Sequence, residues 1–341
     1  MAGRTADTGD REASEAASGA PAPRRGLVLG GGGSLGAAWT VGALCALEDV
    51  CGWDPRSADV ILGTSAGAIV GSLLALGASP TELLGHQRGE AEVPGPLGGV
   101  RLHYDTWVGG ALPRLPRPGV GSLKLLLDLA EHPHRMPLPT VLAAAAPPGR
   151  GSLGGVRDLF HQLGMDDHWP DNPALRVVAV DLDTGTRVLF GTPGAPPTDL
   201  ASAVTASCAL PSWFEPVRID GSRYVDGCAW SDTNLDLLAG EELDEVFVLA
   251  PTCARETDHP HSIPARVERR LRRGSTARLL REAVAVRDAG ALVHVLVPGP
   301  EDLAAMGANL MAPQHRLTVL ETSLRTTTAA LTGGGVVTER P

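Results

Sequence analysis

A pentapeptide of sequence Gly-Thr-Ser-Ala-Gly, residues 63–67, restricts the fold more than any other part of this chain. Residues 59–62 form an apolar run that predicts a buried strand, and residues 66–76 have aliphatic side chains at helical spacing. A strand that enters a helix through one residue needs a sharp turn, which the flanking glycines permit. Ser65 then lies at a helix N-terminus, where the dipole favours negative charge. A nucleophile needs that position, although a chain with 42 glycines also contains this pattern by chance.

A second strand and helix are predicted at residues 26–29 and 37–50, with a glycine-rich loop, residues 30–36, between them. The loop satisfies the dinucleotide pattern G-x-G-x-x-G, but the acidic residue expected at the end of the next strand is missing, since Asp59 lies at its beginning. A nucleotide triphosphate loop requires a lysine, and this loop has none. An oxyanion hole, with amides directed at an anion formed on attack by Ser65, explains both glycine-rich elements.

Later segments extend this pattern, and together the motifs resemble those of the patatin-like phospholipases. That family combines a glycine-rich loop near the N-terminus, a G-x-S-x-G nucleophile shortly after it and a distant Asp-Gly pair, present here as Asp226-Gly227. Residues 177–190 and 206–217 are also similar to family segments ahead of the aspartate. The resemblance covers roughly residues 25–235.

The resemblance implies a catalytic dyad in which Ser65 attacks the substrate and Asp226 accepts its proton, without a histidine. It also implies an oxyanion hole of backbone amides, which we expect at Gly31, Gly32, Gly33, Ser34 and Ala66. The other motif glycines, which allow close turns, are Gly36, Gly63, Gly67 and Gly227. The implied activity is hydrolysis of a lipid or fatty-acyl ester, with no cofactor and no metal.

Two residues depart from the family pattern. The family commonly has an arginine just before the last glycine of the first loop, where this chain has Leu35. Cys228 follows the Asp-Gly pair, where the family usually has glycine or alanine. Leu35 keeps open a catalytically weakened lipid-binding or regulatory protein, and acyl transfer to an alcohol is a further alternative to hydrolysis.

A Ser-Asp-His triad is the main rival to the dyad. Its histidine would be His259, His261, His294 or His315, which all follow Asp226 in the chain. An α/β-hydrolase normally has several strands before its nucleophile, and only two fit before Ser65. We therefore favour the dyad, which predicts a pH profile without a histidine-like limb near pH 6.5.

Composition restricts the class of protein further. The net charge of −10 argues against a nucleic-acid partner. Five cysteines without a C-x-x-C pair indicate reduced thiols and a cytoplasmic protein. Residues 1–24 lack an apolar run, so we expect a disordered tail rather than a signal peptide. No stretch approaches 18 consecutive apolar residues, so no transmembrane helix is expected.

These observations predict one catalytic domain at residues 25–330 with a three-layer α/β/α patatin-like fold. Its central, largely parallel sheet would take strands near residues 26, 60, 177, 187, 247 and 292. A proline-rich insertion at about residues 90–171 is either a lid or a set of packed connections. A closing helix is expected at residues 311–327, and residues 331–341 are expected to be loose.

A basic segment lies between the last two predicted strands. Residues 265–281 hold seven arginines and one glutamate, a local excess of +6, with Ile263, Val267 and Leu271 at four-residue spacing. A basic amphipathic helix can rest on an anionic membrane, which would place the protein at the periphery of a membrane. The alternative is an ordinary helix that docks by its apolar face and leaves a basic face in water.

Overall fold

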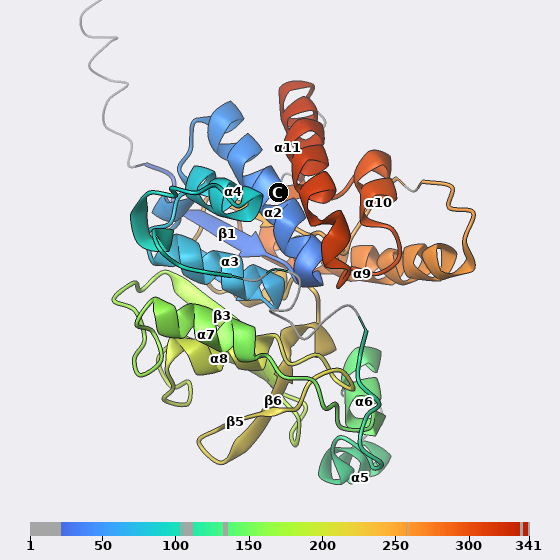
Figure 1. The fold of residues 1–341 in the computed structure, drawn as a ribbon. Coiled ribbons are helices and arrows are strands. Elements are labelled where there is room, and N and C mark those ends of the chain that lie inside the picture. The colour runs from blue at the N-terminus through green and yellow to red at the C-terminus, as the bar shows by residue number, and fades with distance from the viewer. Residues whose placement is uncertain are drawn as a thin grey trace, which may run out of the picture.

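The computed structural model describes residues 22–102, 104, 112–131, 136–256, 258–334 and 337–339. The expected N-terminal tail, residues 1–24, lies almost entirely outside the described residues. Figure 1 shows helices on both faces of a central sheet, with α5 and α6 at one end of the molecule, away from α2 and α11.

The described residues form a nine-stranded sheet with the order β5-β6-β3-β2-β1-β7-β8-β9, and β4 also pairs with β3. The central neighbours are parallel, and pairing is antiparallel toward both edges. The strands are β1 (Arg25–Leu29), β2 (Val60–Thr64), β3 (Leu175–Asp181), β4 (Arg187–Phe190), β5 (Val217–Ile219), β6 (Ser222–Asp226), β7 (Glu245–Leu249), β8 (Leu292–Leu296) and β9 (Val337–Glu339).

Alternating strand residues enter two separate cores, because successive side chains point to opposite faces of a sheet. Leu27 and Leu29 of β1 join one core, whereas Val28 joins the other. Helices α2 (Gly33–Cys51), α3 (Ala66–Ala75), α4 (Pro80–Arg88), α7 (Gly154–Gln162), α8 (Leu200–Ser207) and α11 (Arg316–Thr332) contribute to the first core, and α9 (Ile263–Asp288) contributes to the second. The predicted α/β/α class with a largely parallel sheet is confirmed.

Several boundaries differ from the sequence-based expectation. Helix α2 begins at Gly33, so half of the expected glycine loop is helical. The C-terminal residues were expected to be loose, but β9 pairs antiparallel with β8. The closing helix α11 begins at Arg316, and residues 308–311 form a loop before it. The short antiparallel strands β5 and β6 were not among the expected strands, although Asp220 and Gly221, both with positive φ, form a two-residue hairpin turn between them.

The proline-rich insertion holds more helix than expected. The sequence predicts short helical pieces at about residues 123–129 and 156–163, which the structure has as α5 (Leu123–Glu131) and α7, and the insertion also contains α6 (Leu138–Ala145). Helix α10 (Pro300–Met306) follows β8 later in the chain. Parts of the insertion, residues 103, 105–111 and 132–135, lie outside the described residues. The choice between a lid and packed connections therefore stays a prediction.

Among the described residues, α2 alone is long and apolar enough to cross a membrane by length and composition. Of its apolar window, 78% is buried inside the protein. A Cβ atom added at Gly42 would lie 2.6 Å from the Leu320 carbonyl oxygen, so α2 packs tightly against α11. A buried helix of a globular core meets the same criteria of length and composition.

Candidate active site

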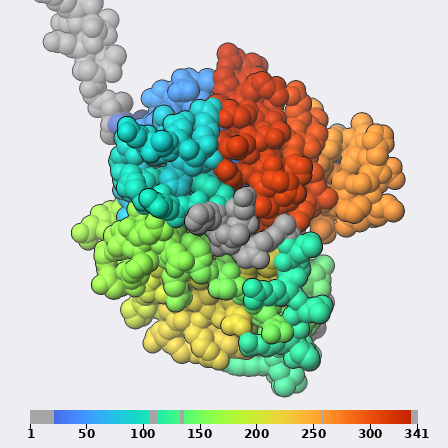
Figure 2. All heavy atoms as spheres, viewed as in Figure 1, coloured from blue at the N-terminus to red at the C-terminus, as the bar shows by residue number. Residues whose placement is uncertain are grey.

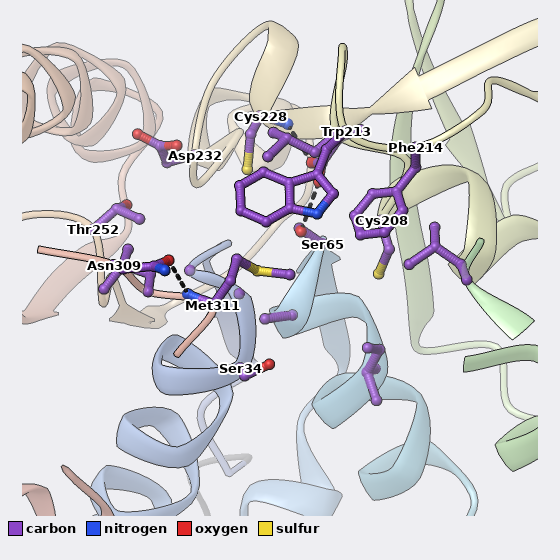
Figure 3. A pocket seen from close by; sticks show the side chains of 18 of the residues that line it. Ser34, Ser65, Cys208, Trp213, Phe214, Cys228, Asp232, Thr252, Asn309 and Met311 are labelled. Carbon is purple, nitrogen blue, oxygen red and sulfur yellow. Dashed lines mark hydrogen bonds between the residues drawn. The ribbon is translucent and has the colours of Figure 1, made fainter. Parts of the chain in front are cut away.

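Ser65 occupies the turn between β2 and α3. It is the N-cap of α3 and has φ 55° and ψ −121°, a strained conformation for a residue with a Cβ atom. The flanking glycines make the turn possible: a Cβ atom at Gly67 would lie 2.0 Å from the Leu29 carbonyl oxygen, and one at Gly63 would lie 2.5 Å from the Ala68 Cα atom. The turn directs the Ser65 hydroxyl into a pocket (Figure 3).

Asp226 meets Ser65 although 161 residues separate them. The Ser65 hydroxyl donates a hydrogen bond to Asp226 Oδ2 at 2.7 Å. The sheet order explains this contact, because β6 ends at Asp226 and pairs with β3, which pairs with β2. The Cys228 amide donates to Asp226 Oδ1 at 2.8 Å, and the Asp226 amide donates to the Ala209 carbonyl oxygen. The carboxylate is therefore held on both sides.

The surroundings of Asp226 change its acidity. Burial raises the pKa of Asp226 to about 6, against the opposing effect of the hydrogen bonds from Cys228 and Ser65. A carboxyl group with this pKa is ionised above neutrality but is a stronger base than an exposed aspartate. A general base works best when its pKa lies near the working pH.

Two helix N-termini converge on Ser65. The amides of Gly33 and Ser34 lie in the first turn of α2, and the amide of Ala66 lies in the first turn of α3. Such N–H groups have no acceptor within their own helix and attract anions. These residues and Gly32, the N-cap of α2, line the pocket together with Ser65.

Gly31 does not fit its expected role as an oxyanion donor. Its amide donates a hydrogen bond to the Asp232 carbonyl oxygen at 2.9 Å and is therefore engaged. The position still needs glycine, because an added Cβ atom would lie 2.3 Å from Cys228 Sγ and 3.2 Å from Ser65 Cβ. Gly31 thus leaves room for Ser65, and a backbone contact with residue 232 was not visible in the sequence.

The remaining motif positions are structural. The Gly36 amide donates to the Gly32 carbonyl oxygen, and a Cβ atom at Gly227 would lie 2.8 Å from the Val178 carbonyl oxygen. Leu35, which replaces the family's arginine, is fully buried in the core, and its amide donates to the Leu310 carbonyl oxygen. Its side chain does not line the pocket.

Ser65 opens into a cavity of about 310 Å³ with mostly apolar walls. The lining residues labelled in Figure 3 include Trp213, Phe214 and Met311. Among the described residues that line the cavity, two are carboxylates, Asp226 and Asp232, and none is a lysine, arginine or histidine. The full lining is Gly32, Gly33, Ser34, Ser65, Ala66, Ile69, Leu153, Cys208, Leu210, Trp213, Phe214, Asp226, Cys228, Asp232, Thr252, Ala308, Asn309, Leu310 and Met311.

Sequence reasoning missed several parts of this wall. Asp232 follows the Asp-Gly motif by a few residues, so its closeness to the site could have been inferred. Thr252 follows β7, whose end lies beside that of β1, and the end of a parallel strand was a usable signal. Residues 308–311 carry no motif, and only the folded chain brings them to Ser65.

The candidate histidines lie elsewhere. His294 is on β8 and stacks on Phe247 with ring centroids 4.6 Å apart. His259 and His261 line a different cavity beside the arginines of α9, and His315 ends a short turn before α11. The described wall of the Ser65 cavity therefore contains no third member for a triad.

Among the described residues, neither the cysteines nor a group of metal ligands marks a second reactive site. All five cysteines are unpaired, and burial raises the pKa of the Cys208 and Cys228 thiols that line the cavity, which keeps them protonated. Within the residues that the structure describes, no group of three or more His, Cys, Asp or Glu side chains could hold a metal ion.

The fold and the site define a class: an α/β/α protein with a serine nucleophile position at a strand-helix turn and an aspartate beside it. The family model for patatin-like phospholipases matches residues 27–94 and 100–239, so the chain belongs to this family, as its motifs predicted. Membership indicates lipid acyl hydrolase activity in general and a lipid substrate.

Two further comparisons add little. The crystal structure of VipD from Legionella pneumophila is 17% identical and has a TM-score of 0.40, and the match covers 94% of this chain and 68% of that chain. A likeness at this level supports no conclusion about function. No curated protein matches the chain.

Proposed function

We propose that this protein is a serine hydrolase that cleaves carboxylic esters of lipids, with Ser65 as nucleophile and Asp226 as general base. The observation that carries the proposal is the 2.7 Å hydrogen bond from the Ser65 hydroxyl to the buried Asp226 carboxylate, at the floor of an apolar cavity. A carboxylate in this position can remove the serine proton directly.

The reaction would proceed in two halves. As Ser65 Oγ attacks the ester carbonyl carbon, Asp226 takes its proton, and the carbonyl oxygen becomes an oxyanion. The amides of Gly32, Gly33, Ser34 and Ala66 would stabilise this charge. Collapse of the intermediate expels the alcohol, which receives the proton from Asp226, and leaves an acyl-serine. Asp226 then activates a water molecule that releases the fatty acid and restores Ser65.

The walls of the cavity support a fatty-acyl substrate. Ile69, Leu210, Phe214 and Met311 present apolar surface next to Ser65, which suits a hydrocarbon chain. Residues 25–330 would form the catalytic domain, and the unpaired cysteines support a reducing compartment such as the cytoplasm.

Hydrolysis of p-nitrophenyl esters of increasing acyl length tests this proposal. We expect turnover to depend on acyl length and to disappear in Ser65→Ala. Ser72→Ala is a matched control, because Ser72 is a buried serine on the same helix that does not line the cavity. Equal activity of the parent and Ser65→Ala would refute the assignment. Acyl transfer, the alternative, would appear as a new ester when glycerol competes with water.

A further inference from the structure

Helix α9 is inverted with respect to an ordinary amphipathic helix. In an ordinary docked helix Ile263, Val267 and Leu271 would face the protein, yet 74%, 54% and 69% of their surfaces are exposed. Their four-residue spacing places them on one stripe of the helix. Figure 2 shows this part of the chain, in orange, projecting from the side of the molecule. The interpretation of α9 as a helix docked by this apolar stripe is therefore wrong.

The opposite side of the same two turns is buried and charged. Arg269 forms a two-point ion pair with Asp258, at 2.6 and 3.0 Å, and also pairs with Glu268. Arg272 pairs with Glu268 at 2.5 Å and donates to the Pro251 carbonyl oxygen. Both arginine side chains are almost completely buried. Ion pairs, rather than apolar side chains, attach this end of α9 to the protein.

Exposed arginines flank the apolar stripe. Arg266, Arg270 and Arg273 follow helical spacing on the neighbouring stripe, and all three are exposed. Within the described part of the chain, Arg270 and Arg273 have no acidic partner, and Arg266 donates to the Pro260 carbonyl oxygen. We call the surface formed by Ile263, Arg266, Val267, Arg270, Leu271 and Arg273 the outer α9 face.

We infer that the outer α9 face docks onto an anionic membrane surface. A stripe of large apolar side chains exposed to water is typical of a binding surface, and the neighbouring arginines favour a negatively charged partner. The chain as a whole is acidic, with a net charge of −10, so an anionic lipid surface would attract this basic face and repel most others. Juxtaposed apolar and cationic stripes are the arrangement that interfacial helices use.

The docking face is connected to the proposed active site. Arg269 donates to the carbonyl oxygen of Leu303 in α10 and to that of Gly307, which directly precedes the pocket-lining residues 308–311. Arg272 holds the Pro251 carbonyl oxygen beside Thr252, which also lines the pocket. A membrane that holds α9 from outside would therefore lie close to one wall of the Ser65 cavity.

A second exposed apolar surface provides a matched control. Leu123 and Leu127 of α5 are also four residues apart, with 63% and 62% of their surfaces exposed. Their helix carries two acidic residues, Asp128 and Glu131, against one cation, Lys124, and has no arginine stripe. An anionic surface should therefore bind α9 and not α5.

Vesicle co-sedimentation tests the inference on the full chain, with Ser65→Ala as background so that no lipid is consumed. We expect binding to vesicles of equimolar phosphatidylcholine and phosphatidylglycerol, and much weaker binding to phosphatidylcholine alone. The pair Val267→Ser/Leu271→Ser should lower the partition coefficient at least about tenfold. The pair Arg270→Gln/Arg273→Gln should lower it about fivefold per arginine at low salt, and added salt should remove that difference.

The control pair Leu123→Ser/Leu127→Ser should bind like the background protein. Unchanged binding by both α9 pairs, or an equal loss in the α5 pair, would overturn the inference. It would also fail if sedimentation velocity showed a dimer that the α9 pairs convert to monomer, because the cover would then be a second copy. Hydrolysis of a short soluble p-nitrophenyl ester by α9 variants with Ser65 intact should match the parent, so this test stands apart from the proposed chemistry.

Discussion

The Asp226 carboxylate connects stability with activity at the scale of a single residue. Its pKa is raised from 3.8 to about 6 by burial, so the folded state holds a proton that the unfolded state releases between these values. Stability therefore falls as pH rises through this window, by up to about 3 kcal/mol. The ionised base beside Ser65 therefore lowers the free energy of unfolding at neutral and higher pH.

Asp226→Asn should consequently separate folding from function. We expect hydrolysis to fall by about 10² to 10⁴, because the general base is removed. Above pH 7 the variant should be more stable than the parent, by up to about 3 kcal/mol, because no buried charge forms. Urea unfolding at pH 5 and pH 8 checks this prediction. If the parent and the variant differ in free energy of unfolding by the same amount at both pH values, Asp226 titrates normally.

The raised pKa also corrects an expectation about pH. A dyad whose aspartate has an ordinary pKa predicts no limb near pH 6.5, but Asp226 with a pKa of about 6 should produce one, with activity rising as pH increases. The pH profile alone therefore does not distinguish the dyad from a triad.

Histidine substitutions do distinguish them. We expect most activity to remain when a single histidine is replaced by Gln, at His259, His261, His294 or His315. A folded variant as inactive as Ser65→Ala would show that a triad is present instead of the dyad.

At the scale of elements, the first turn of α2 is the least predictable part of the site. Glycine has a low helix propensity, so the sequence placed the helix start after Gly36, whereas packing of Leu35 in the core starts it at Gly33. The strand-helix turn at Ser65 was predictable, because both flanking patterns were strong. A backbone hydrogen bond such as that from the Gly31 amide to the Asp232 carbonyl oxygen leaves no pattern in the sequence. Gly31 was therefore wrongly expected to be an oxyanion donor.

A pair of glycine substitutions tests the helix terminus. Gly33 has φ 60°, and an added Cβ atom would lie 2.6 Å from Met311 Sδ and 3.0 Å from the Leu310 carbonyl oxygen. Gly52, at the other end of α2, has φ 61° and no atom within 4 Å of such a Cβ. Both alanine variants carry similar backbone strain, but only Gly33→Ala should lower turnover, by about 10² to 10³ if an oxyanion amide is displaced. Equal turnover in the two alanine variants would show that the amides of α2 are not part of the oxyanion hole.

At the scale of the whole molecule, the family and the fold class were predictable, and one of the two sheet edges was not. Two strand-turn-helix units with motifs define the parallel centre, as β1 and β2 show. The edge strands β5 and β9 have three residues each. Strand β5 forms a hairpin with β6 through Asp220-Gly221, which is a local turn signal, whereas β9 forms only by pairing with the distant β8. The same holds for residues 308–311, which reach the pocket only through tertiary packing.

The distribution of charge over the molecule predicts a substrate preference. The described cavity wall has two carboxylates and no cation, whereas exposed arginines gather on the outer α9 face. Burial raises the pKa of Asp232, and the nearby Arg278 and Arg272 oppose that rise. With Asp232 ionised, an anionic headgroup at the cavity would be repelled. In neutral detergent micelles, we expect a monoacylglycerol to be hydrolysed faster than its phosphate ester, lysophosphatidic acid. Asp232→Asn should lower the ratio of these two hydrolysis rates several-fold, up to about tenfold. A preference for the phosphate ester by the parent would contradict this account.

The most direct test of the central claim is the rate at which a fluorophosphonate probe labels Ser65, measured by intact-protein mass and peptide mapping across pH. The Ser65–Asp226 dyad predicts a single adduct on Ser65 in the parent, formed faster as pH rises through about 6. It also predicts labelling at least about 10²-fold slower in Asp226→Asn. An unlabelled parent, an adduct on another residue, or equal labelling of Asp226→Asn would contradict the dyad.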